Sequence, residues 1–256
     1  RHLLEFAKEI MGPDQIAGAS LNHWRTAENR ACIAYSARAF VRGPIEPSHF
    51  YRDYARAFGI EDTARYARIM QELDDLDDLG REKMFNIGFC ANGCWVRPGL
   101  RWTQRWDNAS IEEARKRYGS VITELAACLQ SATTPPGREL LRFLTNRVEC
   151  TILQLDCAQT MKGLGAFCDH DHPEALTAEQ KQQVAETCAK AMDLAQRYLA
   201  KHAEAIIDRG CEGTLISYQT TLPNYIDHIR SVFVNGEKKC THFLPQFDEP
   251  PPPATV

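Results

Sequence analysis

The 256-residue sequence lacks any uninterrupted apolar run approaching the roughly 20 residues that span a bilayer, so we expect no membrane partner. It also lacks an excess of basic residues, since 30 Lys and Arg stand against 34 Asp and Glu. The net charge is -4 and the pI is about 6.1. Domains that bind nucleic acids concentrate positive charge, and we therefore expect no nucleic acid partner either.

The chain also lacks an initial Met and begins directly within a helical pattern. Residues 1–10 carry apolar side chains at helical spacing rather than the pattern of a signal peptide. We therefore expect the sequence to be a segment of a longer protein. The compartment stays open, and is secreted or periplasmic if the parent protein carries a signal peptide.

Ten cysteines are many for a chain of this size. Most fall within helical patterns, where a buried thiol packs as a small apolar side chain. Cys90 and Cys94 lie in a loop-like stretch and are spaced for a short disulfide in an oxidising compartment. The run Cys168-Asp169-His170-Asp171-His172 has the residue types of a metal site, but Pro173 follows at once and a polar loop is the commoner explanation. We predict no metal and no cofactor.

The first forty residues read as a helix, a strand and a second helix. Leu3 to Ile10 has helical spacing, and the short apolar run Ile16 to Leu21 is typical of a buried strand. An Ala-rich helix then continues to about Phe40. Because a lone strand leaves its backbone donors and acceptors without partners, we expect upstream residues to complete its sheet.

From Pro47 the pattern is almost entirely helical, because apolar side chains recur at three- and four-residue steps. A capping box places Ser or Thr three residues before Glu or Gln, and this spacing predicts helix starts at Ser110 and Thr177. We expect the helix from Thr177 to end at Gly210. The other predicted helices cover residues 50–58, about 62–80, 140–163 and 225–233.

Polar and aromatic residues crowd the end of the predicted strand, at Asn22-His23-Trp24-Arg25. In a barrel of alternating strands and helices, the C-terminal ends of the strands form the active-site face. The alternative is a strand end that is merely capped by polar residues, with Trp24 in the core. Composition alone does not choose between these interpretations.

The run His23-Trp24-Arg25-Thr26, with Phe50-Tyr51-Arg52-Asp53-Tyr54-Ala55 and Phe58-Gly59, resembles part of certain TIM-barrel glycoside hydrolases, the alpha-glucuronidase-like and beta-hexosaminidase-like enzymes. In that family the final barrel strand ends in a similar His-Trp-Arg run, and a C-terminal helical domain adds loops to the barrel mouth. The resemblance implies a mainly α fold, in which a helical bundle domain follows a short α-β-α remnant of a (β/α) barrel. The implied divisions are 1–42 for the barrel piece, 43–245 for the helical domain and 246–256 for a proline-rich tail.

The resemblance further implies a glycoside hydrolase that acts on oligosaccharides or glycoconjugates, with the missing N-terminal barrel as the partner of this segment. The catalytic carboxylates of such enzymes belong to earlier barrel strands, so this segment would not contain the acid or the nucleophile. Asp14 and Glu28, the acidic residues nearest the strand end, have no partner at a recognisable position. We expect the strand-end residues Asn22, His23, Trp24 and Arg25 to bind the carbohydrate substrate.

A second candidate patch extends from Cys94 to Trp106 and holds three of the four tryptophans and three arginines. Trp faces stack on sugar rings, and Arg donates in its plane to hydroxyl or carboxylate oxygens, so this mixture suits a saccharide. The alternative is a loop pinned to the bundle by buried Trp side chains with Arg stacked over them. We name Trp95, Arg97 and Trp102 as substrate-binding candidates.

Two other classes of function stay open. Asp74-Asp75-Leu76-Asp77-Asp78 has the aspartate-rich spacing that binds magnesium diphosphate in helical isoprenoid synthases, although no second metal-binding run follows, and a solvated helix end is the simpler account. The patch 94–106 also suits a protein partner, because Trp and Arg are enriched at interaction hot spots. A non-catalytic helical interaction module is therefore the main alternative to the glycoside hydrolase.

Overall fold

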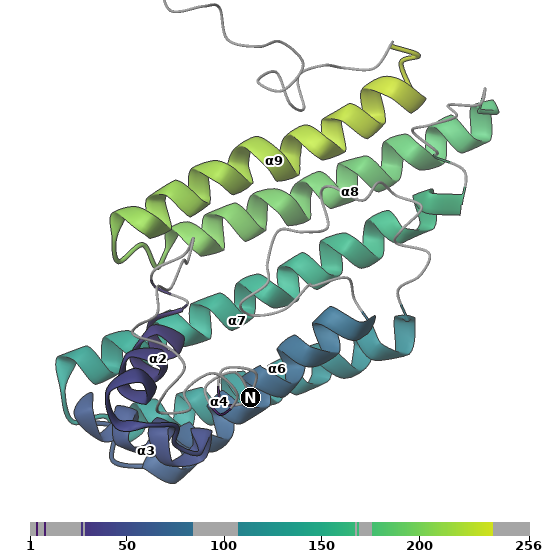
Figure 1. Ribbon diagram of the computed structural model, residues 1–256. Coiled ribbons are helices and arrows are strands. Elements are labelled where there is room, and N and C mark those ends of the chain that lie inside the picture. Colours follow the sequence, from purple (N-terminus) through teal and green to yellow (C-terminus); the bar gives the residue numbers. More distant parts are fainter. Residues whose placement is uncertain are drawn as a thin grey trace, which may run out of the picture.

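The structure is a computed structural model that describes residues 29–83, 107–166 and 176–237, together with Leu4, Lys8, Ala27 and Cys168. Within these ranges every regular element is a helix and no strand occurs (Figure 1). The elements are α2 (Arg30–Arg42), α3 (Pro47–Ala57), α4 (Thr63–Lys83), α6 (Asn108–Gln130), α7 (Pro135–Lys162), the short 3-10 helix η2 (Gly163–Ala166), α8 (Ala178–Ala203) and α9 (Arg209–Phe233).

The prediction of a mainly α fold is confirmed for the described ranges. The α-β-α barrel remnant is not shown, because the predicted strand Ile16 to Leu21 and nearly all of the predicted helix before it lie outside the described residues. Of that region the structure describes chiefly α2, which ends at Arg42 just before Gly43 adopts a positive φ of 81°. The division after residue 42 stays a prediction.

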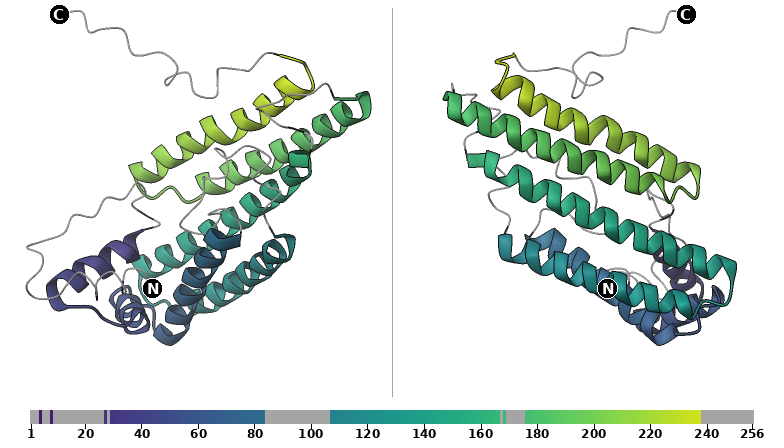
Figure 2. Two further views of the ribbon diagram at one scale, coloured as in Figure 1. Left: turned by 45° about the vertical axis from the view of Figure 1, so that its right-hand side comes forward. Right: turned by 180° about the vertical axis from the view of Figure 1, so that it is seen from behind.

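The long helices form an antiparallel bundle laid out as a row. α4, α6, α7, α8 and α9 follow one another in space as they do in sequence, and each packs against the helix before it and the helix after it (Figures 1 and 2). α3 packs on α4 at one end of the row, and α2 lies beside α3. The connections from α3 to α4, from α6 to α7 and from α8 to α9 are short and favour this arrangement, because a short connection leaves room only for an antiparallel neighbour.

The width of the apolar surface on each helix matches its place in the row. α7 lies in the middle and is buried toward both neighbours, with Leu144 and Val148 buried on one side and Cys150 and Cys157 on another. α9 ends the row and buries essentially one stripe, toward α8. The buried residues of that stripe are Cys211, Thr214, Tyr218, Leu222, Tyr225, Ile226, Ile229 and Phe233.

Of the helix boundaries predicted from capping and Gly signals, one is confirmed and two are wrong; in addition, α7 and α9 begin earlier than the predicted residues 140 and 225. The capping box at Thr177 is present, with both reciprocal hydrogen bonds to Gln180. The N-cap of α6 is Asp107 rather than Ser110, because the Asp107 carboxylate lies three residues earlier and already accepts the N–H of Ala109 at 3.0 Å. The helix from Thr177 ends at Ala203 and not at Gly210, which instead lies in the first turn of α9.

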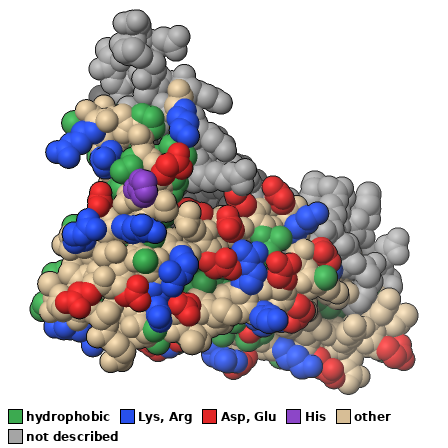
Figure 3. All heavy atoms as spheres, turned by 90° about the horizontal axis from the view of Figure 1, so that it is seen from below, with side chains coloured by type: hydrophobic (Ala, Val, Ile, Leu, Met, Phe, Trp, Pro, Cys, Tyr) green, Lys and Arg blue, Asp and Glu red, His purple; other side chains and the backbone are tan. Residues whose placement is uncertain are grey.

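The surface carries both signs of charge in alternation. On the face in Figure 3, Lys and Arg side chains are interspersed with Asp and Glu, so this face has no patch of a single sign. Such a surface gives no electrostatic footprint for nucleic acid on this side. None of the described helices combines the length and the apolar character needed to cross a membrane.

Candidate functional site

The seven residues predicted to bind carbohydrate all lie outside the described residues: Asn22, His23, Trp24, Arg25, Trp95, Arg97 and Trp102. The structure does place the two ends of the segment that contains the last three. α4 ends at Lys83, and Asp107 is the N-cap of α6. The connection therefore spans residues 84–106, whereas a connection between bundle helices commonly needs only about 2–8 residues.

The two ends of segment 84–106 meet at the same end of the bundle. The carboxylate of Asp107 accepts the Ser110 hydroxyl at 2.8 Å and the Ala109 N–H at 3.0 Å. These hydrogen bonds, that of Ser110 above all, lower the pKa of Asp107, and the positive charge of Lys83 lowers it further. Ile60, just before α4, pairs with Ala132, just after α6, so these two packed helices are antiparallel and the chain leaves α4 and enters α6 at the same end of the bundle.

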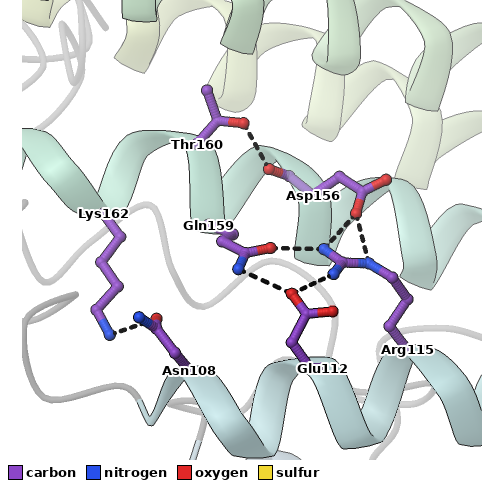
Figure 4. A network of polar contacts seen from close by, with 7 residues as sticks. All are labelled: Asn108, Glu112, Arg115, Asp156, Gln159, Thr160 and Lys162. Carbon is purple, nitrogen blue, oxygen red and sulfur yellow. Dashed lines mark hydrogen bonds and ion pairs between the residues drawn. The ribbon is translucent and has the colours of Figure 1, made fainter.

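A connected set of polar side chains lies between α6 and α7, close to this entry point. We call it the α6–α7 polar cluster; it comprises Asn108, Glu112, Arg115, Asp156, Gln159 and Lys162 (Figure 4). Arg115 stands at its centre. Its Nε donates to Asp156 Oδ1 at 2.8 Å, its Nη2 to Gln159 Oε1 at 2.7 Å and its Nη1 to Glu112 Oε1 at 2.6 Å.

Two further hydrogen bonds complete the cluster. Gln159 Nε2 donates to Glu112 Oε1 at 3.0 Å, so the side chains of Glu112, Arg115 and Gln159 form a closed ring of contacts. Lys162 Nζ donates to Asn108 Oδ1 at 2.8 Å, one turn nearer the start of α6. Arg115 retains 28% and Asp156 33% side-chain exposure, so both have edges that a ligand can reach.

The electrostatics of the α6–α7 polar cluster suit binding rather than proton transfer. The hydrogen bonds from Arg115 and then from Gln159 lower the pKa of Glu112. Partial burial of Arg115 acts in the opposite direction on its own pKa, but the contacts with Glu112 and Asp156 raise that pKa overall. A general acid needs a raised pKa, so Glu112 is unsuited to donate a proton to a leaving group.

Similar pairs join α6 to its other neighbour. Arg117 Nε donates to Glu72 Oε1 on α4 at 2.6 Å, and Arg65 Nε lies 3.6 Å from Glu124 Oε2. Arg–carboxylate contacts thus hold both flanks of α6 in register. The contacts of Arg115 therefore have a structural role in addition to any role in binding.

The aspartate-rich run lies in α4 and forms no metal centre with other described residues. Tyr51 Oη donates to Asp74 Oδ2 at 3.1 Å, so this carboxylate faces α3. Burial raises the pKa of Asp74, and the nearby charges of Asp75 and Asp78 raise it further. Within the described ranges, no group of three or more His, Cys, Asp or Glu side chains is arranged to hold a metal ion. Geometry of the kind an isoprenoid synthase requires is therefore not seen there.

Sequence reasoning missed a buried polar group between α7 and α8. The Arg147 side chain is fully buried, and its Nη1 donates to Asn146 Oδ1 at 2.7 Å and to the carbonyl of His202 at 3.2 Å. Its Nη2 donates to the carbonyl of Ala205 at 3.0 Å. These carbonyls lie at the C-terminal end of α8, where a cation is favoured because the carbonyl groups there carry partial negative charge. Arg147 therefore joins α7 to the end of α8.

The described cysteines are free thiols, and most are buried. Cys90 and Cys94, the candidates for a short disulfide, lie outside the described residues. Burial is the first cause that raises the pKa of each of the following thiols, to about 11 for Cys32 and Cys128 and to about 12 for Cys150, Cys157, Cys168 and Cys188.

We expect the four thiols with a pKa of about 12 to resist alkylation in the folded protein. Only the thiolate reacts, and at pH 8 such a thiol is ionised in about one molecule in 10,000. Iodoacetamide labelling followed by peptide mass spectrometry should therefore be about 1,000-fold slower for these cysteines in buffer than in urea. Rapid labelling of Cys157 without denaturant would contradict the packing of α7 against α8.

No family model, curated protein or solved structure matches this chain. Its function is therefore argued from the sequence resemblance and from the geometry of the described residues.

Proposed function

We propose that the chain is the C-terminal helical part of a glycoside hydrolase acting on oligosaccharides or glycoconjugates. In this proposal it supplies substrate-binding residues and not the catalytic acid or nucleophile. The observation that carries the proposal is the position of the two residues that flank segment 84–106, because Lys83 and Asp107 lie at the same end of the antiparallel pair α4 and α6. Asp107, where the chain enters α6, directly precedes Asn108 of the α6–α7 polar cluster, and in this proposal the cluster and the segment with Trp95, Arg97 and Trp102 bind the same saccharide.

Segment 84–106 and the α6–α7 polar cluster together have the chemistry that a saccharide requires. A sugar ring presents apolar C–H faces, which stack on Trp, and a rim of hydroxyl groups, which need planar donors and acceptors. Segment 84–106 supplies three Trp side chains. Glu112, Arg115 and Gln159 supply carboxylate, guanidinium and amide groups one to two turns from the point where that segment joins α6.

The experiment is a glycan array followed by calorimetry on the chain and on Trp95→Ala, with sugar hydrolysis assayed in parallel. We expect sugar binding without hydrolysis, and about 5- to 10-fold weaker binding by Trp95→Ala, because a lost aromatic stacking contact costs about 1–1.5 kcal/mol. Glu112→Ala should weaken the same interaction. Ile216→Ala is the matched control, since Ile216 is 60% exposed on α9 and remote from α6.

The main alternative is a non-catalytic helical interaction module in which segment 84–106 binds a protein. One observation favours it: the described helices share a continuous apolar core that does not require the predicted strand. A folded chain that binds no sugar, with helical circular dichroism and a cooperative unfolding transition, would reject the glycoside hydrolase proposal in favour of this one. Sugar binding that Trp95→Ala leaves unchanged would remove segment 84–106 from the proposed site.

A further inference from the structure

The chain leaves α9 through residues 234–237, which we call the α9 end turn, and this turn contains an Asn followed directly by a Gly. Asn235, Gly236 and Glu237 are all exposed. Gly236 has a φ of 70°, in the left-handed region that Gly adopts readily. Apart from its chain neighbours, no atom lies within 4 Å of the position that a Cβ atom on Gly236 would occupy. The backbone of the turn is therefore open to water on that side.

The backbone N–H of Gly236 donates no hydrogen bond within the part of the chain that the structure describes. Both of its neighbours do donate. The Asn235 N–H donates to the carbonyl of Arg230 at 3.4 Å, and the Glu237 N–H donates to the carbonyl of Ser231 at 3.1 Å. These two hydrogen bonds hold the turn on the end of α9 and leave the Gly236 nitrogen between them available for reaction.

The Asn235 side chain lies along the backbone that follows it. Its Nδ2 donates to Glu237 Oε1 at 3.3 Å, a contact that reaches two residues forward. The side chain therefore extends in the direction of the Gly236 nitrogen and not back along α9. Attack of that nitrogen on Asn235 Cγ closes a five-membered ring, and the two reacting atoms are held in one short, exposed turn.

We propose that Asn235 deamidates spontaneously and that its conversion loosens the last turn of α9. The Gly236 nitrogen loses its proton and forms a bond to Asn235 Cγ; the bond from Cγ to Nδ2 breaks, and the side-chain nitrogen takes up a proton and leaves as ammonia. Water then opens the resulting succinimide at either carbonyl and gives Asp or isoaspartate at position 235. Water is the only co-reactant, and the inference does not depend on the proposed binding of saccharides.

The other exposed asparagines among the described residues lack this combination. Asn108 is exposed, but the N–H of Ala109, which would have to attack it, already donates to Asp107 Oδ1 at 3.0 Å. Asn224 is exposed within α9, where the backbone N–H groups donate to carbonyls one turn earlier. Asn235 thus stands apart because of its surroundings as well as its sequence.

Conversion changes the charge and the backbone at the end of α9. A carboxylate at position 235 replaces the hydrogen bond to Glu237 by repulsion between like charges. Negative charge is also unfavourable at the C-terminal end of a helix, where the carbonyl groups carry partial negative charge. Isoaspartate adds a methylene to the backbone and so displaces the Glu237 N–H from the Ser231 carbonyl. The last turn, which contains the buried Phe233, should therefore open more often.

The test is ageing of the full chain at neutral pH, in buffer and in guanidinium chloride, followed by peptide mass spectrometry. We expect Asn235 to convert at similar rates in both, and Asn108 and Asn224 to stay intact in buffer while half of Asn235 converts. Gly236→Ala should slow conversion at least about 10-fold, because a Cβ atom restricts the backbone that must bring the nitrogen to Cγ. Peptide mapping separates Asn235 from Asn92, which also precedes a Gly but lies outside the described residues.

Hydrogen exchange measures the effect on α9. In Asn235→Asp and in the aged chain, residues 230–233 should exchange about 3-fold faster than in the fresh chain, because the added charge weakens the helix end. Asn224→Asp is the matched control, since it adds the same charge to the same helix but not at its end. Conversion of Asn235 only in guanidinium chloride would show that the folded turn protects it and would overturn the proposal. Equal exchange in the fresh and aged chains would overturn the loosening of α9.

Discussion

Replacement of Arg147 by Ala is expected to lower the free energy of unfolding by about 3–5 kcal/mol, because removing one partner of a buried charged contact leaves the others unsatisfied. The guanidinium donates to Asn146 Oδ1 and to the carbonyls of His202 and Ala205. The Cζ atom of the Arg147 guanidinium also lies 4.7 Å from the centroid of the Phe143 ring. Truncation would leave these acceptors buried without their donor and open a cavity between α7 and α8.

Urea unfolding monitored by circular dichroism measures this loss. Arg147→Met separates the loss of the hydrogen bonds from the opening of the cavity, because Met retains most of the side-chain volume but none of the donors. We expect Arg147→Met to recover less than half of the loss. Arg197→Ala is the matched control: Arg197 lies on α8 with its side chain 61% exposed, so its ion pair with Asp193 contributes little. A loss below about 1 kcal/mol for Arg147→Ala would contradict the buried contact.

The sequence shows Arg147 only as an interruption in an apolar pattern. It stands between Leu144 and Val148, both buried, at a position where helical spacing calls for an apolar side chain. Its acceptors, the carbonyls of His202 and Ala205, are 55 and 58 residues away. Periodicity reports which side of a helix is buried, but it does not report which backbone atoms of another helix lie opposite. The residue could be noticed in the sequence, but not explained.

The start of α8 at Thr177 could be predicted because its signal is local. Thr177 and Gln180 form the predicted capping box because both hydrogen bonds lie within one turn. α9 was recognised only near its end, since Gly210, Gly213 and Pro223 all disfavour a helix interior. Packing on α8 and the N-cap bond from the Cys211 N–H to Asp208, at 2.8 Å, outweigh those propensities.

The candidate site, like the helices, could be predicted from the sequence only in part. The sequence identified the Trp-rich patch 94–106 by composition, and the structure describes the residues on either side of segment 84–106, Lys83 and Asp107. The α6–α7 polar cluster was not predicted. Glu112 and Arg115 are three residues apart and visible as a helical pair, but Asp156 lies 41 residues from Arg115. Only the pairing of α6 with α7 brings the second carboxylate to the same guanidinium.

Gly137→Ala is expected to destabilise the protein by about 1–2 kcal/mol, against the usual sign for a helical glycine. In an open helix position Ala is favoured over Gly by about 0.5–1 kcal/mol. Here a Cβ atom on Gly137 would overlap the backbone carbonyl oxygen of Phe58, and would lie 3.2 Å from Thr134 Oγ1 and 3.4 Å from Ile60 Cγ1.

The corner around Gly137 has little room to relax. Phe58 is followed by Gly59, whose φ of 70° is accessible mainly to Gly, and the carbonyl of Gly59 accepts the Thr133 N–H at 2.9 Å. The carbonyl of Phe58 itself accepts the Thr134 hydroxyl. A shift of Phe58 away from a new Cβ would therefore strain both contacts, and overpacking of this kind costs about 1–3 kcal/mol.

Gly119→Ala provides the opposite expectation in the same protein. Gly119 lies in α6 with no atom within 4 Å of the Cβ position, so the substitution should stabilise the protein by up to about 1 kcal/mol. Urea unfolding of both variants under the same conditions shows directly whether each substitution raises or lowers the free energy of unfolding. If Gly137→Ala stabilised the protein as Gly119→Ala does, the close approach of α7 to the carbonyl of Phe58 would be wrong, and with it the way in which α3 is joined to the start of α7.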